Sequence, residues 1–117
     1  MINYHKEIVN SLNSILPTYH EMILHSGIKT PCISYMELNN AAAETGDTLG
    51  YSSIQYQVKI WGEKIGDLQE YAQQIDNTLR PIGWKRIGCR ELYDKESAMI
   101  QKIMTYDANA LEVFEEV

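Results

Sequence analysis

The sequence lacks a long apolar run, and it has few basic residues. No stretch approaches the ~18 consecutive apolar residues of a membrane-spanning helix, so we expect no membrane contact. Ten Lys and Arg stand against sixteen Asp and Glu, which gives a net charge of -6. Specific nucleic-acid binding needs clustered basic residues, and only Lys85, Arg86 and Arg90 form a local group. On a regular strand, Arg86 and Arg90 would share a face and Lys85 would point away.

Cysteine is also scarce, with Cys32 and Cys89 far apart and without a partner motif. We expect both to be reduced core thiols of a cytosolic protein. The first ten residues, MINYHKEIVN, have no apolar segment of a secretory signal.

Chemical motifs are missing as well. The three histidines are isolated from one another, and no His, Cys and Glu cluster has metal-ligand spacing. No phosphate-binding loop or nucleophile elbow is present. Arg90 could lower the pKa of the Cys89 thiol, but no matched histidine accompanies it. The sequence therefore predicts no enzyme, no metal and no cofactor.

What the sequence does contain is the pattern of one small domain spanning residues 1–117. Apolar residues at helical spacing predict a helix over residues 4–16, which Pro17 ends. For residues 18–23 the pattern fits either a short strand or a loop. Residues 31–38 are rich in strand formers, and residues 39–50 predict a long mobile hairpin loop.

The stretch GYSSIQYQVKIWG, residues 50–62, alternates with a period of two, which is typical of a strand with one buried face. A second helix is predicted within residues 63–83, with Asp67 and Glu70 as a capping box. Residues 84–94 and 98–108 predict two further strands, and residues 109–117 form a short acidic tail. The fold class is therefore α+β, a mostly antiparallel sheet of about four strands with two amphipathic helices on one face.

The predicted core consists of the inward positions of two helices and two strands: Ile8, Leu12, Ile15, Tyr35, Ile54, Tyr56, Val58, Ile60, Leu68, Ala72, Ile75 and Leu79. The opposite face of the alternating strand is polar and nearly uncharged. A merely solvated face would usually carry more Lys and Glu, so we predict an assembly interface there, made of Ser53, Gln55, Gln57, Lys59 and Trp61. Trp61 and Trp84 each either cap the core or anchor an interface.

The order of elements resembles a known family. An opening helix precedes PCISYMEL, a polar loop, the strand IQYQVKIWG, the helix DLQEYAQQIDNTL and a final strand AMIQKIMTYDA. Over residues 4–108 this pattern is similar to the tail terminator and tail completion proteins of long-tailed bacteriophages, prophages and phage-tail-like particles. The resemblance rests on pattern and size, and no motif assigns a role to a single residue.

The resemblance implies a non-enzymatic structural protein. Such proteins form a ring, usually hexameric, at the head-proximal end of the tail tube, where they stop tube polymerisation and join tail to head. The implied partners are further copies of the chain, the tail tube protein and a head connector or neck protein, with DNA only in passage. The implied location is the host bacterial cytoplasm during assembly and then the tail-neck region of the virion.

Two further groups of residues have predicted roles. We expect the long loop to contact a partner through Asn40, Glu44, Thr45, Asp47 and Thr48. An acidic channel wall would let DNA slide without sticking, and the candidates for its charge in the tail are Glu112, Glu115 and Glu116.

Two alternatives remain at this point. The chain could be a head-closure or connector protein at the neck of the same particle. It could instead be a small bacterial ligand-binding or regulatory domain with a pocket under Tyr35, Tyr56 and Trp61.

Overall fold

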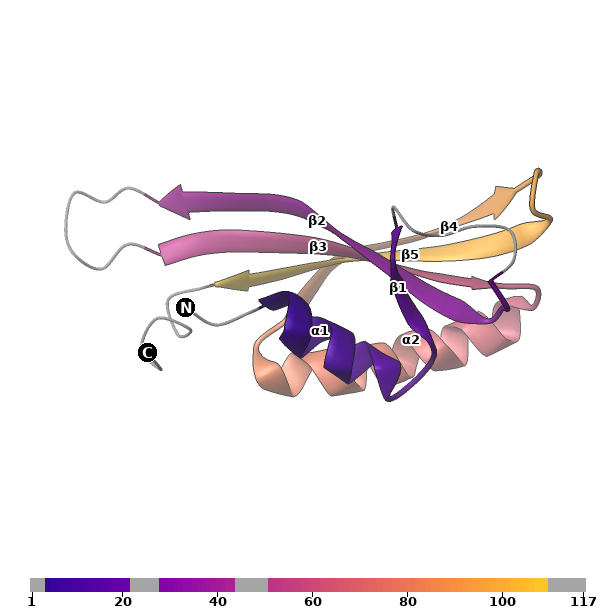
Figure 1. The fold of residues 1–117 in the computed structure, drawn as a ribbon, viewed down its shortest axis with the longest axis horizontal. Helices are drawn as coiled ribbons and strands as arrows, with labels where there is room; N and C mark the ends of the chain where they lie inside the picture. The colour runs from indigo at the N-terminus through magenta and orange to yellow at the C-terminus, as the bar shows by residue number, and fades with distance from the viewer. Residues whose placement is uncertain (1–3, 22–27, 44–50, 110–117) are drawn as a thin grey trace.

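The computed structural model describes residues 4–21, 28–43 and 51–109. Two helices and five strands make up this part of the chain (Figure 1). In chain order they are α1 (Tyr4–Asn13), β1 (Thr18–His20), β2 (Cys32–Ala43), β3 (Tyr51–Gly62), α2 (Ile65–Leu79), a 3-10 turn (Arg80–Ile82), β4 (Lys85–Asp94) and β5 (Met99–Asn109).

The five strands form a single sheet in the order β1-β2-β3-β5-β4. β1 pairs with β2 in parallel, and every other pair is antiparallel. Both helices lie along the same face of the sheet (Figure 1), which we call the inner face, and the opposite face is the outer face. The predicted α+β class is confirmed. The sheet has one more strand than the expected four, because the short segment after Pro17 pairs with β2.

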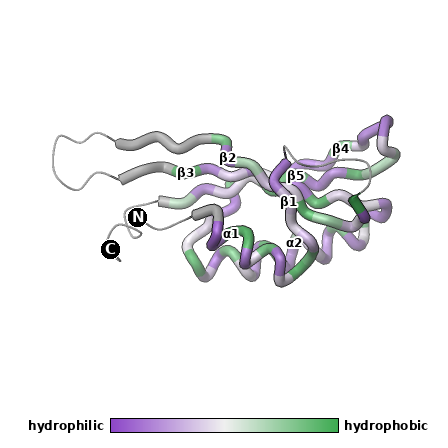
Figure 2. The backbone as a smooth tube through the Cα atoms, viewed as in Figure 1, coloured by the Kyte–Doolittle hydropathy of each residue, from purple (hydrophilic) through white to green (hydrophobic). Residues whose placement is uncertain are grey.

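The core lies between the inner face and the two helices. Along each helix, apolar and polar residues alternate (Figure 2). Ten of the twelve predicted core residues are buried. The other two, Ile15 and Tyr35, are partly buried and pack against the cluster. The cluster also contains Leu16 and Trp84, which the predicted core list left out, and three residues that the sequence analysis did not consider: Ile33, Met104 and Tyr106.

α1 ends at Asn13, earlier than the predicted residue 16. The backbone N–H groups of Ile15 and Leu16 still bond the Leu12 carbonyl, at 2.9 and 3.2 Å. The Asn13 side chain then accepts a bond from the Thr18 N–H at 3.0 Å. This local network turns the chain from α1 into β1, because the residue before a proline is disfavoured in a helix.

The predicted loop over residues 39–50 is wrong in its first part. β2 continues to Ala43, and its backbone from Asn39 to Ala43 pairs with residues 51–55 of β3. An extra residue, Leu38, interrupts the ladder between Glu37 and Asn39. Such a bulge allows pairing to resume after a shift of register. Residues 44–50 lie outside the described part of the chain.

The start of α2 differs from the predicted capping box. The N-cap is Lys64, without a side-chain capping bond, and Asp67 lies in the first turn, where a negative charge favours the helix dipole. Gly62 allows the close approach of this helix: a Cβ there would lie 2.8 Å from the Leu68 Cδ2. Gly83 ends the following turn with a φ of 101°, which glycine adopts without strain.

A second bulge lies in β4. Arg86 pairs with Tyr106 and Gly88 pairs with Thr105, so Ile87 is the extra residue. The bulge reverses the expected alternation, and Arg86 lies on the inner face while Lys85 and Arg90 lie on the outer face. The prediction that Arg86 and Arg90 share a face is therefore wrong.

Candidate assembly surface

The polar side chains predicted to form an interface come from the outer face of β3. Gln55 and Gln57 are half-buried there, opposite Asp107 and Thr105 of β5. The backbone of Ser53 is paired on both sides, with Ala41 and Asn109. The strand thus places these positions along one face, as the period of two predicts.

Lys59 and Trp61, by contrast, have partners within the chain. The Lys59 ammonium lies 2.5 Å from the Glu21 carboxylate and 5.8 Å from the centre of the Trp61 ring. The Trp61 indole N–H donates to the Ser34 hydroxyl at 2.9 Å. The polar atom of this tryptophan is therefore satisfied within its own chain, on the outer face.

Several neighbours of Trp61 on the outer face are buried, while Trp61 itself is partly exposed. Cys32, Ser34 and Ile103 lie on this face and are buried, and burial raises the pKa of the Cys32 thiol. The ion pair to Glu21 shows that the chain after β1 reaches onto this end of the face. Further along β3, Gln55 and Gln57 are also partly exposed on the outer face.

Trp84 and the two tyrosines of the alternative pocket lie elsewhere. Trp84 is 2% exposed, and its ring meets Tyr56 edge-on, with the ring centres 5.3 Å apart. Tyr35 and Tyr56 stack on the inner face, 6.3 Å apart. Trp61 is on the outer face, so a pocket lined by Tyr35, Tyr56 and Trp61 together is excluded. Trp84 caps the core.

β4 is an unusually exposed strand, which the sequence analysis did not single out as a surface. None of its ten residues is buried, and three large apolar side chains on it are about half exposed: Ile87, Leu92 and Tyr93. Cys89 is exposed as well, which corrects the expectation of a core thiol. The sequence KRIGCRELYD itself indicates an exposed edge strand, because it has no continuous apolar face and carries charges throughout.

One row of paired residues crosses the sheet from edge to edge. Glu37 of β2 pairs with Tyr56, Tyr56 with Tyr106, and Tyr106 with Arg86 of β4. The Tyr106 hydroxyl donates to the carboxylate of Asp76 on α2. This carboxylate also lies 3.5 Å from the Nε of Arg86. Burial and the hydrogen bond to Asp76 raise the pKa of Tyr106.

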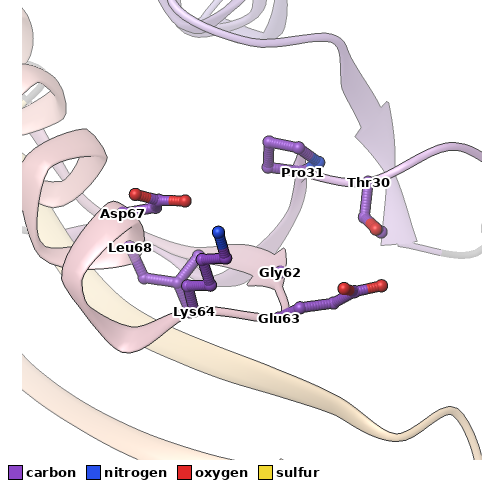
Figure 3. Close-up of a pocket in the computed structure, with 7 residues that line it drawn as sticks. All are labelled: Thr30, Pro31, Gly62, Glu63, Lys64, Asp67 and Leu68. Carbon is purple, nitrogen blue, oxygen red and sulfur yellow. The ribbon is translucent and has the colours of Figure 1, made fainter.

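A small pocket lies where β3 turns into α2. Its volume is 170 Å³, below the 300–1,000 Å³ or so of typical ligand sites. Figure 3 shows that its lining comes from the turn before β2, the end of β3 and the start of α2. The residues are Thr30, Pro31, Gly62, Glu63, Lys64, Asp67 and Leu68. Within the described ranges no three His, Cys, Asp or Glu side chains are grouped as metal ligands.

The remaining predicted site residues are not brought into this surface. Asn40 is part of β2, where its backbone pairs with Ile54. The other loop residues, Glu44, Thr45, Asp47 and Thr48, lie outside the described residues. So do the three tail carboxylates, Glu112, Glu115 and Glu116. Their roles stay predictions.

Comparison with known proteins shows a likeness of fold. No protein-family model matches the chain, and no curated protein matches it either. A chain in the solved structure "Virion of native gene transfer agent (GTA) particle" matches with a TM-score of 0.60 and 9% sequence identity. The match covers 87% of this chain and 82% of that chain. Among the helices of the described residues, none has the length and apolar character needed to cross a membrane.

Proposed function

We propose that the chain is a non-enzymatic structural protein of a phage-like particle, and that it acts as a tail terminator. Copies of it form a ring, hexameric in our proposal, at the head-proximal end of the tail tube. The observation that carries this proposal is the fold shared with a chain of a gene transfer agent virion over most of both lengths. The order of elements, which resembles that of the tail terminator family, supports the same role.

The surface of the subunit supports assembly in two ways. β4 leaves one long strand edge of the sheet exposed, and exposed edges pair readily with other strands. Gln55 and Gln57 present amide groups on the outer face, and amides form hydrogen bonds across an interface without the desolvation cost of charges. In this role the loop at residues 44–50 contacts the tail tube protein.

The net charge supports the passage of DNA through the ring. With a charge of -6, the subunit repels phosphates on average, so DNA would slide through a channel without being held. We assign Glu112, Glu115 and Glu116 to the wall of this channel. The partners are then the tail tube protein on one side and a head connector or neck protein on the other. Assembly takes place in the host bacterial cytoplasm, before the subunit becomes part of the tail-neck region.

The test is assembly with the tail tube protein of the same particle. We expect the subunit to bind at tube ends as a ring, visible by electron microscopy, and to shorten tubes when it is present during polymerisation. The double variant Gln55→Arg with Gln57→Arg should weaken assembly in light scattering or increase the retention of DNA. A chain that leaves tube length unchanged and never binds a tube end would contradict the proposed role.

A head-closure or connector protein of the same particle is the second candidate. It is supported by the same fold likeness, which names a virion and no position within it. The same experiment separates the two candidates, because a neck protein would bind the head connector and leave free tube ends unchanged.

A further inference from the structure

The edge of the sheet at β4 is open in the part of the chain that the structure describes. β4 is the last strand in the sheet order, and β5 is its one neighbouring strand. The N–H and C=O groups that point away from β5 are therefore available to a further strand along the whole of β4.

The charges of β4 are divided between its two halves. The basic residues Lys85, Arg86 and Arg90 come first along the strand, and the acidic residues Glu91 and Asp94 follow. In an antiparallel pair of identical strands, the first half of each strand lies against the second half of the other. Opposite charges on facing strands stabilise the pair, so β4 is complementary in charge to a second copy of itself.

Symmetry limits the register of such a pair. A two-fold axis perpendicular to the sheet sets one residue of β4 opposite its own copy. Arg90 or Glu91 at this axis would set like charges directly opposite each other, which is destabilising. Gly88 at the axis would instead set Arg90 against Lys85. Cys89 avoids both conflicts, so the favoured register has Cys89 at the axis.

This register sets opposite charges together on the inner face. With Ile87 as the extra residue of the bulge, Arg86 lies opposite Glu91 of the second copy. The Arg86 Nε lies 3.5 Å from Asp76, and the terminal N–H groups of a guanidinium can bind a second carboxylate. Glu91 is 4.0 Å from the Lys102 ammonium, which is too far for a hydrogen bond. The contacts within the chain therefore leave both groups able to pair across the axis.

A second pair of opposite charges lies on the outer face. Lys85 lies opposite Leu92 of the second copy and diagonally opposite its Asp94, which is within reach of a long side chain. Neither Lys85 nor Asp94 belongs to an ion pair within the described ranges. The Asp94 carboxylate accepts bonds from the Glu96 N–H and the Ser97 hydroxyl, at 3.3 and 2.8 Å, and keeps its charge uncompensated. The two-fold axis repeats each contact once.

The same register brings an exposed tyrosine to a hollow. Tyr93 is 60% exposed on the inner face, and it lies opposite Trp84 of the second copy. A hollow of 450 Å³ surrounds that position, lined by Arg80, Gly83, Trp84, Lys85 and Arg86. An aromatic ring beside arginine side chains gains a cation–π contact, so this hollow suits the Tyr93 ring.

We infer that β4 forms a two-fold antiparallel pair with β4 of a second copy of this chain. Cys89 lies at the axis, and Tyr93 of each copy occupies the hollow at the start of the other copy's β4. The contact uses the backbone edge of β4, and Gln55 and Gln57 of β3 take no part in it. The inference goes beyond the proposed function and does not rest on it, because it concerns the free chain in solution.

The thiol of Cys89 tests the pairing in the wild-type chain. A short bis-maleimide should join two copies through Cys89, because directly opposite side chains have Cβ atoms roughly 4.5–5.5 Å apart. Cys32 is 1% exposed and should not react. Cys89→Ser should give no cross-linked dimer on a denaturing gel.

The variant K85C/L92C/C89S tests the register. Lys85 and Leu92 of two copies face each other, so this variant should give cross-linked dimers and no larger species. The matched controls K85C/C89S and L92C/C89S should give none, because equal positions of the two copies lie about 20 Å apart along the strands. Circular dichroism should show that all three variants are folded.

The contact of Tyr93 is tested by the affinity of the pair. Sedimentation equilibrium of the wild-type chain should show dimers that depend on concentration. Tyr93→Ala should raise the dissociation constant roughly tenfold or more, since tyrosines that fill a pocket are frequent hot spots of interfaces. Ile65→Ala is the control, because Ile65 on α2 is 51% exposed and lies outside the contact.

Three results would overturn the inference. The first is a chain that sediments as a monomer at the highest concentration reached and gives no cross-link through Cys89. The second is a ladder of trimers and larger species from K85C/L92C/C89S, which would show head-to-tail pairing. The third is cross-linking through Cys89 without any from K85C/L92C/C89S, which would show a different contact. A chain that pairs as inferred and never binds a tube end would uphold the inference and refute the proposed function alone.

Discussion

β3 and β4 belong to the same sheet, yet they differ in almost every respect. The four inner residues of β3, Ile54 to Ile60, have no exposed surface, whereas none of the ten residues of β4 is buried. β3 has a strand on each side and the two helices beneath it, while β4 has a single neighbouring strand. α2 packs mainly against β3 and β5, and it meets β4 through the ion pair between Asp76 and Arg86. β3 is therefore held by apolar burial, and β4 by its ladder with β5.

The difference separates residues that hold the fold from residues that are free of the core within one sheet. A strand that contributes little to the core can change its surface without endangering the fold, and it is free to meet a partner. β3 has no such freedom on its inner face, and its outer face is partly committed to the contacts of Lys59 and Trp61. The most direct way to test this division is to place the same change in both regions.

The largest contrast is expected for an introduced carboxylate. Val58→Asp places an unpaired charge between sheet and helices, where the side chain is 0% exposed, and should cost roughly 3–5 kcal/mol of folding free energy. Ile87→Asp on β4 should change it by about 0.5 kcal/mol or less. Urea unfolding of both variants measures the difference. A Val58→Asp protein that unfolds like the wild type would show that the inner face is assigned wrongly.

A smaller effect is expected for the hydroxyl of Tyr106. Tyr106→Phe removes its hydrogen bond to Asp76 and should cost about 1.5–3 kcal/mol, as bonds to charged groups do. Tyr93→Phe is the matched change on β4, where the side chain is 60% exposed, and should have no measurable effect.

The same tyrosine predicts how stability depends on pH. The pKa of Tyr106 is raised in the folded chain above its ordinary value of 10.0. The unfolded chain therefore loses this proton first, so the contribution of Tyr106 to the free energy of unfolding is constant below about pH 10 and falls as the pH rises further. In Tyr106→Phe the fall should be shallower. An equally steep alkaline loss in Tyr106→Phe would show that other groups cause it.

A pair of glycines should respond with opposite signs. Gly62→Ala forces its Cβ to within 2.8 Å of the buried Leu68, which should cost about 1–3 kcal/mol through overpacking. Gly66→Ala meets no atom within 4 Å and should stabilise α2 by up to about 1 kcal/mol. Thermal melting of the two variants is sufficient, and a stabilised Gly62→Ala would contradict the close approach of α2 to β3.

The two thiols test the same comparison in the wild-type chain, without any substitution. Cys89 on β4 is exposed and should react with a maleimide at once in the folded chain. Cys32 should react only after unfolding, because it is buried and its raised pKa disfavours the thiolate. Mass spectrometry should show one label per chain in buffer and two in urea. Two labels in buffer would place Cys32 at the surface.

The core and the element order could be predicted because they depend on local pattern. The apolar spacing of residues 54–60 and of residues 65–79 specifies a strand and a helix with one buried face each, whatever surrounds them. Pro17 and Gly83 mark helix ends through backbone restrictions that need no tertiary contact. The prediction of a loop at residues 39–43 was wrong because the structure there depends on a distant segment and not on local pattern. A strand of Asn and Ala forms there only because β3 offers its backbone as a partner.

The sequence by itself determined the buried faces of α1, β3 and α2, since these follow from the apolar preference of each side chain and its spacing along the chain. The tertiary structure decided which of the remaining residues stay exposed. The bulge at Ile87 places Arg86 and Arg90 on opposite faces, and the position of β4 at the sheet edge leaves all ten of its residues unburied. Both depend on strand pairing between distant segments, where one extra residue moves every later side chain to the other face.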